Sequence, residues 1–553
     1  MKKRVLALIL AGVMALSLLL SGCGGSTATS ESSTAEESSK TEESSQAEES
    51  ETNEESSEAA ETSDVAWDTS VNDTIVISVI NNYYTAGWKL MAEEYTKLHP
   101  ETKVTVDVVA DNSTYTQKMT TWLTADDLSE AADIVHVNFA AGPVGGYNVM
   151  FEKDMIYDFN DMLDETNPYD NGNLVRDSFK DSDRALLQNE GRSYALPFDF
   201  CGVAIMYNQD MLDEYGIALP TTYEELIAAC ETLQAAGVEV PIAASSEASW
   251  YLSAFADAAL RNQEEIFLVQ PEDGAYDAET MSANDGFKFD ENDWTCDRYT
   301  VLSGERVAMY KLENKFTDET TVKVWEQFAA VAKYFTPNYS QAASTDVLSS
   351  FELGNSAFLL SGSWNVGVLN ADMMELGDDA FEWGTMSFPG YENAPEGFQA
   401  KMRTLYVTGN VMGIIKTQGD GDHLERVKDF YKFCYCKEGC QKMYEATLNA
   451  GNFVQGPAAI VGVELDESLT KKLEGFVQEG SIKGDFGGIC GQSGAMSEDE
   501  GTYNEALNNL LSGKITAQEF CETISPLCLK SVQDGIEKNG YDLDPSTKDE
   551  VKA

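Results

Sequence analysis

Aromatic and amide side chains come directly after apolar, β-branched runs of this sequence, at places where they could recognise a small polar molecule. Asn82 and Tyr83 follow the run 75–80, and Asn138 follows the run 134–137. Aromatic rings stack on the apolar C–H faces of a sugar, and planar amides exchange hydrogen bonds with its hydroxyl groups. These residues are therefore candidate ligand contacts, although Asn138 could equally satisfy a turn.

Further candidates of the same kinds lie later in the chain. Trp250 and Tyr251 follow the polar loop 245–249, which comes after an apolar run, and one of the two is expected to face the ligand. Asn410 offers another amide, again with the alternative of satisfying a turn. Three other tryptophans lie on apolar helical stripes and are expected in the core: Trp88, Trp122 and Trp325.

Catalytic chemistry has no comparable support in the sequence. The chain has only three histidines, and the patterns G-x-S-x-G, H-E-x-x-H and the phosphate-binding P-loop are absent. A glycoside hydrolase would need two carboxylates about 5–10 Å apart, and no pair is singled out by its neighbours. His136, within an apolar run, is expected to be a core histidine. We therefore expect a binding protein that is not an enzyme and has no cofactor.

Metal binding is not indicated either. Cys434, Cys436 and Cys440 form C-x-C-x3-C in a predicted helix, where only the last two share a face, and the paired C-x2-C of a zinc site is missing. The acidic residues of 285–300 lack the EF-hand pattern and are expected in a solvated loop. The ten cysteines are dispersed, so we expect no metal site and no disulfide framework.

The N-terminus predicts export and lipid attachment. A basic start precedes the apolar run 5–20, which is short for a membrane span but typical of a secretory signal. The run ends in Leu-Ser-Gly-Cys, which resembles the bacterial lipobox, so Cys23 would carry the lipid. This predicts a signal peptide at 1–22. The segment 23–70, rich in Ser and Glu, is then expected to be a disordered tether.

The charge and length limit the partners and the architecture. A formal net charge of −57 argues against nucleic acid and against electrostatic docking on anionic lipid. Contact with the membrane is therefore expected through the N-terminal lipid alone. Residues 71–553 suffice for two or three domains.

The elements that must position the candidate residues follow from the apolar periodicity. Runs such as 75–80 and 134–137 are apolar on both faces and predict buried strands, with helical stripes between them. This alternation predicts a parallel sheet, which binds ligands beyond the carboxyl ends of its strands. Thr222 and Glu225 form a capping box that begins a helix. Residues 261–300 are acidic, lack periodicity and predict a surface insertion.

Several segments, in this order along the chain, resemble the family 1 extracellular solute-binding proteins, which include the maltose- and oligosaccharide-binding proteins of ABC importers. The resemblance is carried by residues 93–100, 132–135, 191–197, 207–226, 351–364 and 511–520. It implies an α/β fold of the periplasmic-binding-protein type II, in which two hinged lobes each contain a mainly parallel sheet flanked by helices.

The same resemblance implies the extent of the lobes. Lobe 1 is expected to comprise 71–202 plus 358–406, and lobe 2 to comprise 203–357 plus 407–553. The chain is expected to cross first between the lobes near 197–204, where an extended run can absorb the rotation of closure.

The resemblance also implies residue roles and a function. Trp364, after Ser-Gly-Ser, matches the family's cleft tryptophan, and Asp199 would accept hydrogen bonds from the ligand at the hinge. The protein would be a monomer on the extracytoplasmic face of the cell membrane that delivers an oligosaccharide to the permease subunits of an ABC importer. Two alternatives stay open. The fold could bind another solute, such as a peptide or polyamine, or act as a surface adhesin or sensor.

Overall fold

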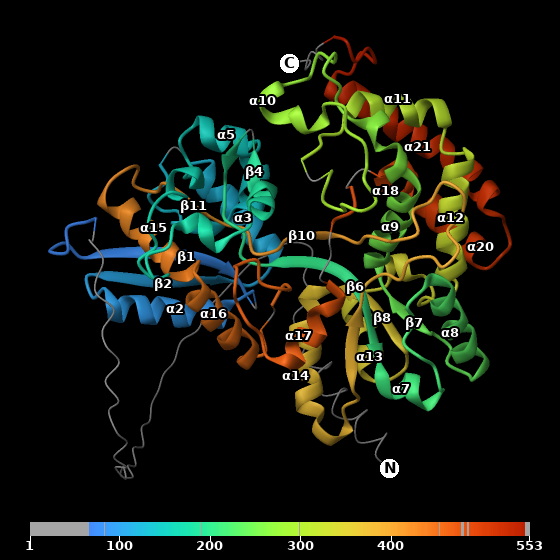
Figure 1. Ribbon diagram of the computed structural model, residues 1–553, viewed down its shortest axis with the longest axis horizontal. Coiled ribbons are helices and arrows are strands. Elements are labelled where there is room, and N and C mark those ends of the chain that lie inside the picture. The colour runs from blue at the N-terminus through green and yellow to red at the C-terminus, as the bar shows by residue number, and fades with distance from the viewer. Residues whose placement is uncertain are drawn as a thin grey trace, which may run out of the picture. The chain divides into compact units, whose positions relative to one another are not determined.

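The computed structural model describes residues 66–547 apart from 82, 126, 190, 298, 453, 477–479 and 484–485 (Figure 1). The predicted signal peptide, Cys23, most of the predicted tether and Asn82 lie outside the described residues. Among the helices of the described chain, none combines the length and the apolar character that a membrane span requires.

The first of two large sheets contains the predicted parallel strands. Its order is β11 (Met412–Ile414), β3 (Ile134–His136), β1 (Asp73–Ile80) and β2 (Thr102–Val109). β1 is parallel to β2 and β3, whereas β11 is antiparallel to β3. Because β1 is buried on both faces, it needs apolar residues at successive positions, as the sequence indicated.

Helices and short strands cover the faces of this sheet. They are α2 (Thr85–Leu98), α3 (Asn112–Leu123), α4 (Val137–Val144), α5 (Tyr147–Glu152), α6 (Asp181–Arg184), α15 (Asp422–Cys434) and α16 (Lys437–Asn449), with the hairpin β4 (Gln188–Asn189) and β5 (Arg192–Ser193). In Figure 1 the orange β11 and α15 lie beside the blue strands, although they come much later in the sequence.

The second sheet is mixed. Its order is β10 (Tyr406–Thr408), β6 (Phe200–Asn208), β8 (Phe358–Gly362) and β7 (Ile242–Ala244), and β9 (Trp383–Met386) also pairs with β6. β7 and β8 are parallel, and β6 is antiparallel to its three partners.

Most of the described helices belong to the chain segments around the second sheet. They are α7 (Gln209–Glu214), α8 (Tyr223–Ala235), α9 (Ser249–Leu260), α10 (Ala278–Met281), α11 (Gly304–Asn314), α12 (Glu319–Ala332), α13 (Ser344–Glu352), α14 (Val366–Leu376), α17 (Glu467–Leu473), α18 (Phe486–Ile489), α19 (Gln492–Glu498), α20 (Glu500–Leu511) and α21 (Ala517–Asn539).

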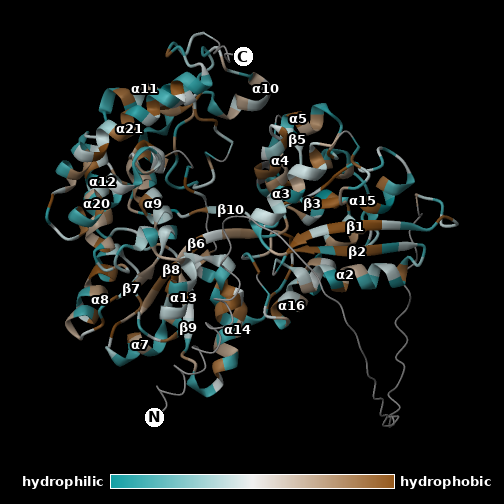
Figure 2. Cartoon of the chain, turned by 180° about the vertical axis from the view of Figure 1, so that it is seen from behind, coloured by the Kyte–Doolittle hydropathy of each residue, from teal (hydrophilic) through white to brown (hydrophobic). Residues whose placement is uncertain are grey.

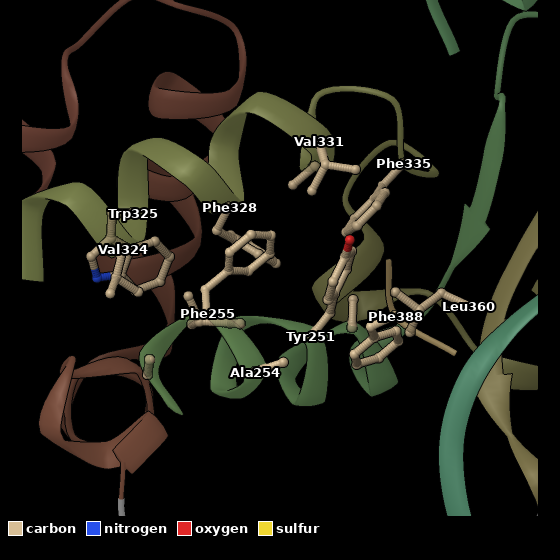
Figure 3. Packing of buried hydrophobic residues seen from close by; sticks show 14 of the residues in the cluster. Tyr251, Ala254, Phe255, Val324, Trp325, Phe328, Val331, Phe335, Leu360 and Phe388 are labelled. Atoms are coloured by element: carbon tan, nitrogen blue, oxygen red, sulfur yellow. The ribbon is translucent and has the colours of Figure 1, made fainter. Parts of the chain in front are cut away.

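Each sheet has its own hydrophobic core. Two clusters of buried apolar side chains cover the two faces of the first sheet. Two other clusters flank the second sheet. Figure 3 shows Phe255 of α9 packed near Phe328 and Trp325 of α12 in the largest cluster. Figure 2 shows alternating hydrophobic and hydrophilic bands on helices such as α8 and α12, as expected where one face packs on a core.

The predicted lobe boundaries need correction after residue 357. β8 and β9 belong to the second sheet, whereas β11 belongs to the first. We therefore define the first lobe as the described parts of 66–198 and 410–460, and the second as those of 200–408 and 469–547. The error has a physical reason: a strand that is buried on both faces, such as β8, could fit in either sheet by its composition alone.

The packing of Trp67 also differs from the prediction. Trp67, within the predicted tether, is only 8% exposed, and its Nε1 donates to Glu101 Oε1 at 3.3 Å. The Arg426 guanidinium lies over the ring and donates to the carbonyl oxygens of Asp68 and Val71. A single aromatic residue among polar neighbours produces no periodic pattern, so the sequence did not reveal this anchor.

Buried ion pairs attach the predicted surface insertion at 261–300 to the rest of the protein. Arg261 is fully buried and pairs with Asp257, Glu264 and Asp297, and Asp297 also accepts from Arg403 at 3.3 Å. Buried ions require such partners because leaving water is costly for each of them. The insertion is therefore part of the second lobe, which corrects the expectation of a wholly solvated loop.

Candidate functional site

The carboxyl ends of β7 and β8 lie at one edge of the second sheet because the two strands are neighbours and parallel. A short 3-10 turn, Ser246–Ala248, follows β7 and leads into α9, which places Glu247 and Trp250 at this edge. Another 3-10 turn, Ser363–Asn365, follows β8 and places Trp364 there. The edge therefore gathers two predicted ligand residues that are more than a hundred positions apart in the sequence.

Glu247 organises this edge, although it was not among the predicted residues. Its Oε1 accepts from Ser344 Oγ at 3.1 Å and from Trp364 Nε1 at 3.3 Å. Its Oε2 accepts from Ser361 Oγ at 2.7 Å, and Asn365 Nδ2 donates to the same Ser361 Oγ at 2.8 Å. In the sequence, the feature that could have pointed to Glu247 was its place in the polar loop before Trp250.

A cavity of about 440 Å³ opens beside Glu247. Its described lining is mostly small and polar: Ser246, Glu247, Ser249, Trp250, Ser253, Tyr339, Ser340, Gly487, Gly488, Gln492, Ser493 and Met496. The Tyr339 hydroxyl is buried and has no hydrogen-bond partner among the described residues. Many hydroxyl groups and one indole face suit a ligand with both hydroxyl groups and apolar C–H surface.

Trp364 contacts the site from the β8 side. Its indole is half-buried and lies so close to Gly362 that a Cβ at that position would overlap the ring. The glycine therefore allows the ring to approach the strand, and the bond to Glu247 fixes the direction of its N–H.

Tyr251 does not face a ligand, which corrects its inclusion among the candidates. It is fully buried, and its ring centroid lies 4.3 Å from that of Phe388 and 4.8 Å from that of Phe255 (Figure 3). Successive helical residues point about 100° apart, so only one of Trp250 and Tyr251 could lie on the cavity side of α9.

The carboxyl edge of the first sheet presents a second group of predicted residues. Asn138 is exposed near the start of α4, and Tyr83 is half-buried after β1. The Tyr83 ring lies edge-on to His136, with centroids 6.4 Å apart. Burial lowers the pKa of His136 to about 3, so its imidazole is neutral and serves as an aromatic wall of this edge.

Asp199 lies in the hinge and has no surface for a ligand, which corrects its predicted role. Its carboxylate accepts from the Tyr84 hydroxyl and from the Asn410 backbone N–H at 2.6 Å. The Gly409 N–H donates to the Asp199 carbonyl oxygen at 3.2 Å. Burial raises the pKa of Asp199 to about 7, although the hydrogen bonds to its carboxyl group oppose the rise.

Asn410 is part of the same hinge and is also removed from the candidate contacts. It is 1% exposed, and its side-chain amide has no hydrogen-bond partner among the described residues. Both residues lie where the chain crosses between lobes, so neighbouring segments cover them. Sequence position near a strand end did not distinguish a hinge from an open edge.

Among the described residues, no three or more His, Cys, Asp or Glu side chains are placed to hold a metal ion. The nine cysteines of this part of the chain are unpaired thiols, and burial raises the pKa of thiols such as Cys440.

Comparison with known proteins identifies a family. A family model described as bacterial extracellular solute-binding protein matches residues 81–439, about two thirds of the chain. No curated protein matches the sequence.

Solved structures share the fold. RafE from Streptococcus pneumoniae, without ligand, has a TM-score of 0.53 and 17% identity, over 83% of this chain and 98% of RafE. The GacH receptor of Streptomyces glaucescens has a TM-score of 0.52 and 16% identity, over 84% and 99% of the two chains. A probable secreted solute-binding lipoprotein from Streptomyces coelicolor has a TM-score of 0.53 and 14% identity, over 82% and 98%.

Proposed function

The chain belongs to the family of bacterial extracellular solute-binding proteins, and from this we propose that it binds a carbohydrate between its lobes and delivers it to an ABC importer. The observation that carries the proposal is the polar cavity at the carboxyl edge of β7 and β8, whose described lining, with Trp250 and Glu247, is the part of the site that the second lobe supplies. Parallel strands bind ligands beyond this edge, and the cavity offers both stacking and hydrogen-bonding groups there.

The similar structures support a sugar as the ligand class. RafE has been solved in complex with raffinose, and the GacH receptor in complex with acarbose and an acarbose homolog. A solute carrier fits the cavity better than a hydrolase does, because Glu247 is the one carboxylate among its described lining residues. Glycoside hydrolysis requires a second carboxylate nearby.

Binding would act through the hinge. A ligand that contacts the Glu247 edge of the second lobe and the Tyr83 and Asn138 edge of the first stabilises the closed arrangement. The permease then recognises that arrangement, so differential affinity for the two states drives delivery. The crossing segments near Asp199 and Asn410 absorb the rotation, since few residues need to change their dihedral angles.

The proposed location follows from the N-terminus. Cys23 would be lipidated after removal of residues 1–22, and the tether would hold a monomeric body on the extracytoplasmic face of the cell membrane.

Thermal unfolding with a panel of oligosaccharides, including raffinose and maltotriose, tests the ligand class. A specific sugar should raise Tm in a concentration-dependent manner, because it binds the folded state. If sugars leave Tm unchanged while peptides or polyamines raise it, carbohydrate is the wrong class. If no solute acts, an adhesin or sensor role gains support.

The contribution of Trp250 can be measured once a sugar binds. Trp250→Ala should weaken binding by on the order of 1–3 kcal/mol, because a stacking surface is lost. Trp122→Ala on α3 is the matched control, since it removes another half-buried indole away from the cavity. Equal affinities of Trp250→Ala and the parent protein in calorimetry would remove Trp250 from the site.

A further inference from the structure

The cavity beside Glu247 has a pronounced charge asymmetry. Among its described lining residues Glu247 carries the only acidic side chain, and none carries a basic one. Lys311 comes close to Gly488 and lines an adjoining cavity of about 210 Å³, which shares Gly488 and Ser493 with the larger one. Glu247 is therefore the charged side chain in the described wall of the larger cavity, and Lys311 lies just beyond that wall.

The hydrogen bonds of Glu247 hold the carboxylate without neutralising it. Its partners are the Ser344 and Ser361 hydroxyl groups and the Trp364 indole N–H, all of which are neutral. The side chain is half-buried, so solvent screens its field only in part.

An indole ring adds to the same preference. Trp250 lines the cavity, whereas Trp364 donates its N–H to Glu247 and is not among the described lining residues. The faces of indole rings attract cations and not anions, because the π-electron density lies on the faces. The carboxylate and the Trp250 ring thus favour the same sign of ligand charge.

We propose that Glu247 makes this site selective for ligand charge, admitting neutral and cationic sugars and rejecting those that carry carboxylate or phosphate groups. The inference rests on the proposed function for its ligand class. It goes beyond that function in naming the residue that excludes acidic sugars.

Quenching of tryptophan fluorescence by iodide and by acrylamide tests the charge of the site without any sugar. Iodide is repelled by the carboxylate, whereas neutral acrylamide is not. Glu247→Gln should therefore raise the ratio of iodide to acrylamide quenching by about twofold at low salt. The rise should become smaller when Trp250→Phe is added, because that ring lines the cavity, and Trp364 then remains as the indole next to Glu247.

Glu239→Gln provides the matched control. It removes the same charge from an exposed position before β7, at the opposite end of the strand from Glu247. Its quenching ratio should stay at the parent value. An equal rise in both variants would indicate a general effect of net charge and overturn the proposal.

The second experiment compares the affinities of sugars of different charge. Maltotriose, a glucosamine trimer and trigalacturonic acid are compared by calorimetry at 0.15 M salt. Relative to maltotriose, Glu247→Gln should strengthen binding of the acid roughly tenfold and weaken binding of the amine roughly tenfold.

Together, the quenching and the calorimetry distinguish the proposed charge selectivity of Glu247 from the proposed carbohydrate function. If the quenching ratio responds but no sugar binds, the charged site stands and the carbohydrate function fails. If sugars bind and Glu247→Gln changes neither the quenching ratio nor the order of affinities, the function stands and the role of Glu247 is overturned.

Discussion

The described groups that face the carboxyl group of Asp199 are tyrosine, cysteine and backbone amide groups, none of which is cationic. They are the side chains of Tyr84, Cys201, Tyr435, Cys440 and Tyr444 and the backbone amides of Asn410 and Gln455. Burial raises the pKa of these tyrosine and cysteine side chains, so Asp199 is the member of this group that titrates near neutrality.

The raised pKa of Asp199 predicts a pH-dependent stability. The folded state binds this proton more tightly than the unfolded chain does, because the pKa rises from the ordinary 3.8 to about 7. The resulting stabilisation is fully present below pH 3.8 and is lost as the pH rises through about 7. Asp199→Asn should remove this loss, which is on the order of 3 kcal/mol, in denaturant unfolding between pH 4 and pH 8. Parallel curves for the two proteins would contradict the prediction.

The residue-level predictions from sequence differ in outcome because the environments of the residues differ. The ligand roles of Trp250, in a cavity wall, and of Trp364 stay predictions, whereas Tyr251, Asp199 and Asn410 are buried. A residue type shows what chemistry a side chain offers. Whether water or a ligand can reach it depends on packing by distant segments, which the local sequence does not encode.

At the scale of elements, the close approach of Trp364 to β8 depends on Gly362. Gly362→Ala should displace the indole or the strand, because the added Cβ overlaps the ring. We expect a loss of about 1–3 kcal/mol of unfolding free energy and weaker sugar binding. Chemical denaturation and calorimetry measure the two effects.

Gly535→Ala is the appropriate comparison for that change. Gly535 lies inside α21, and a Cβ there would meet nothing within 4 Å. This variant should gain about 0.5–1 kcal/mol, because alanine favours a helix. If Gly362→Ala were equally stabilising, the proposed support of Trp364 by the glycine would be wrong.

Elements with strong local signals were predictable, and their pairing was not. The strand at 75–80 lies within β1, and the capping box of Thr222 and Glu225 begins α8. The lobe assignment of 358–406 was wrong because it depended on which strands become neighbours. Alternation of apolar residues fixes the exposed faces of a strand but not its partner.

At the scale of the whole molecule, the described chain passes three times between two hydrophobic cores. It crosses from one core to the other near 199, near 409 and between 460 and 469. With so few covalent links, the relative position of the lobes can respond to a ligand that contacts both.

Small-angle X-ray scattering can measure this response. A sugar that raises Tm should lower the radius of gyration, because closure brings the lobes together. Trp250→Ala should require a higher concentration of the same sugar for the same decrease. An unchanged scattering curve at saturation would contradict closure on binding.

The odd number of crossings has a practical consequence. The chain enters through Trp67, which is packed on the first lobe, and leaves through α21, whose Phe520 and Ile524 belong to the core of the second. Fluorescent proteins fused before Trp67 and after α21 would thus be attached to different lobes. Energy transfer between the two fluorophores would change whenever the lobes close or open, so the fusion would act as an optical sensor for the ligand.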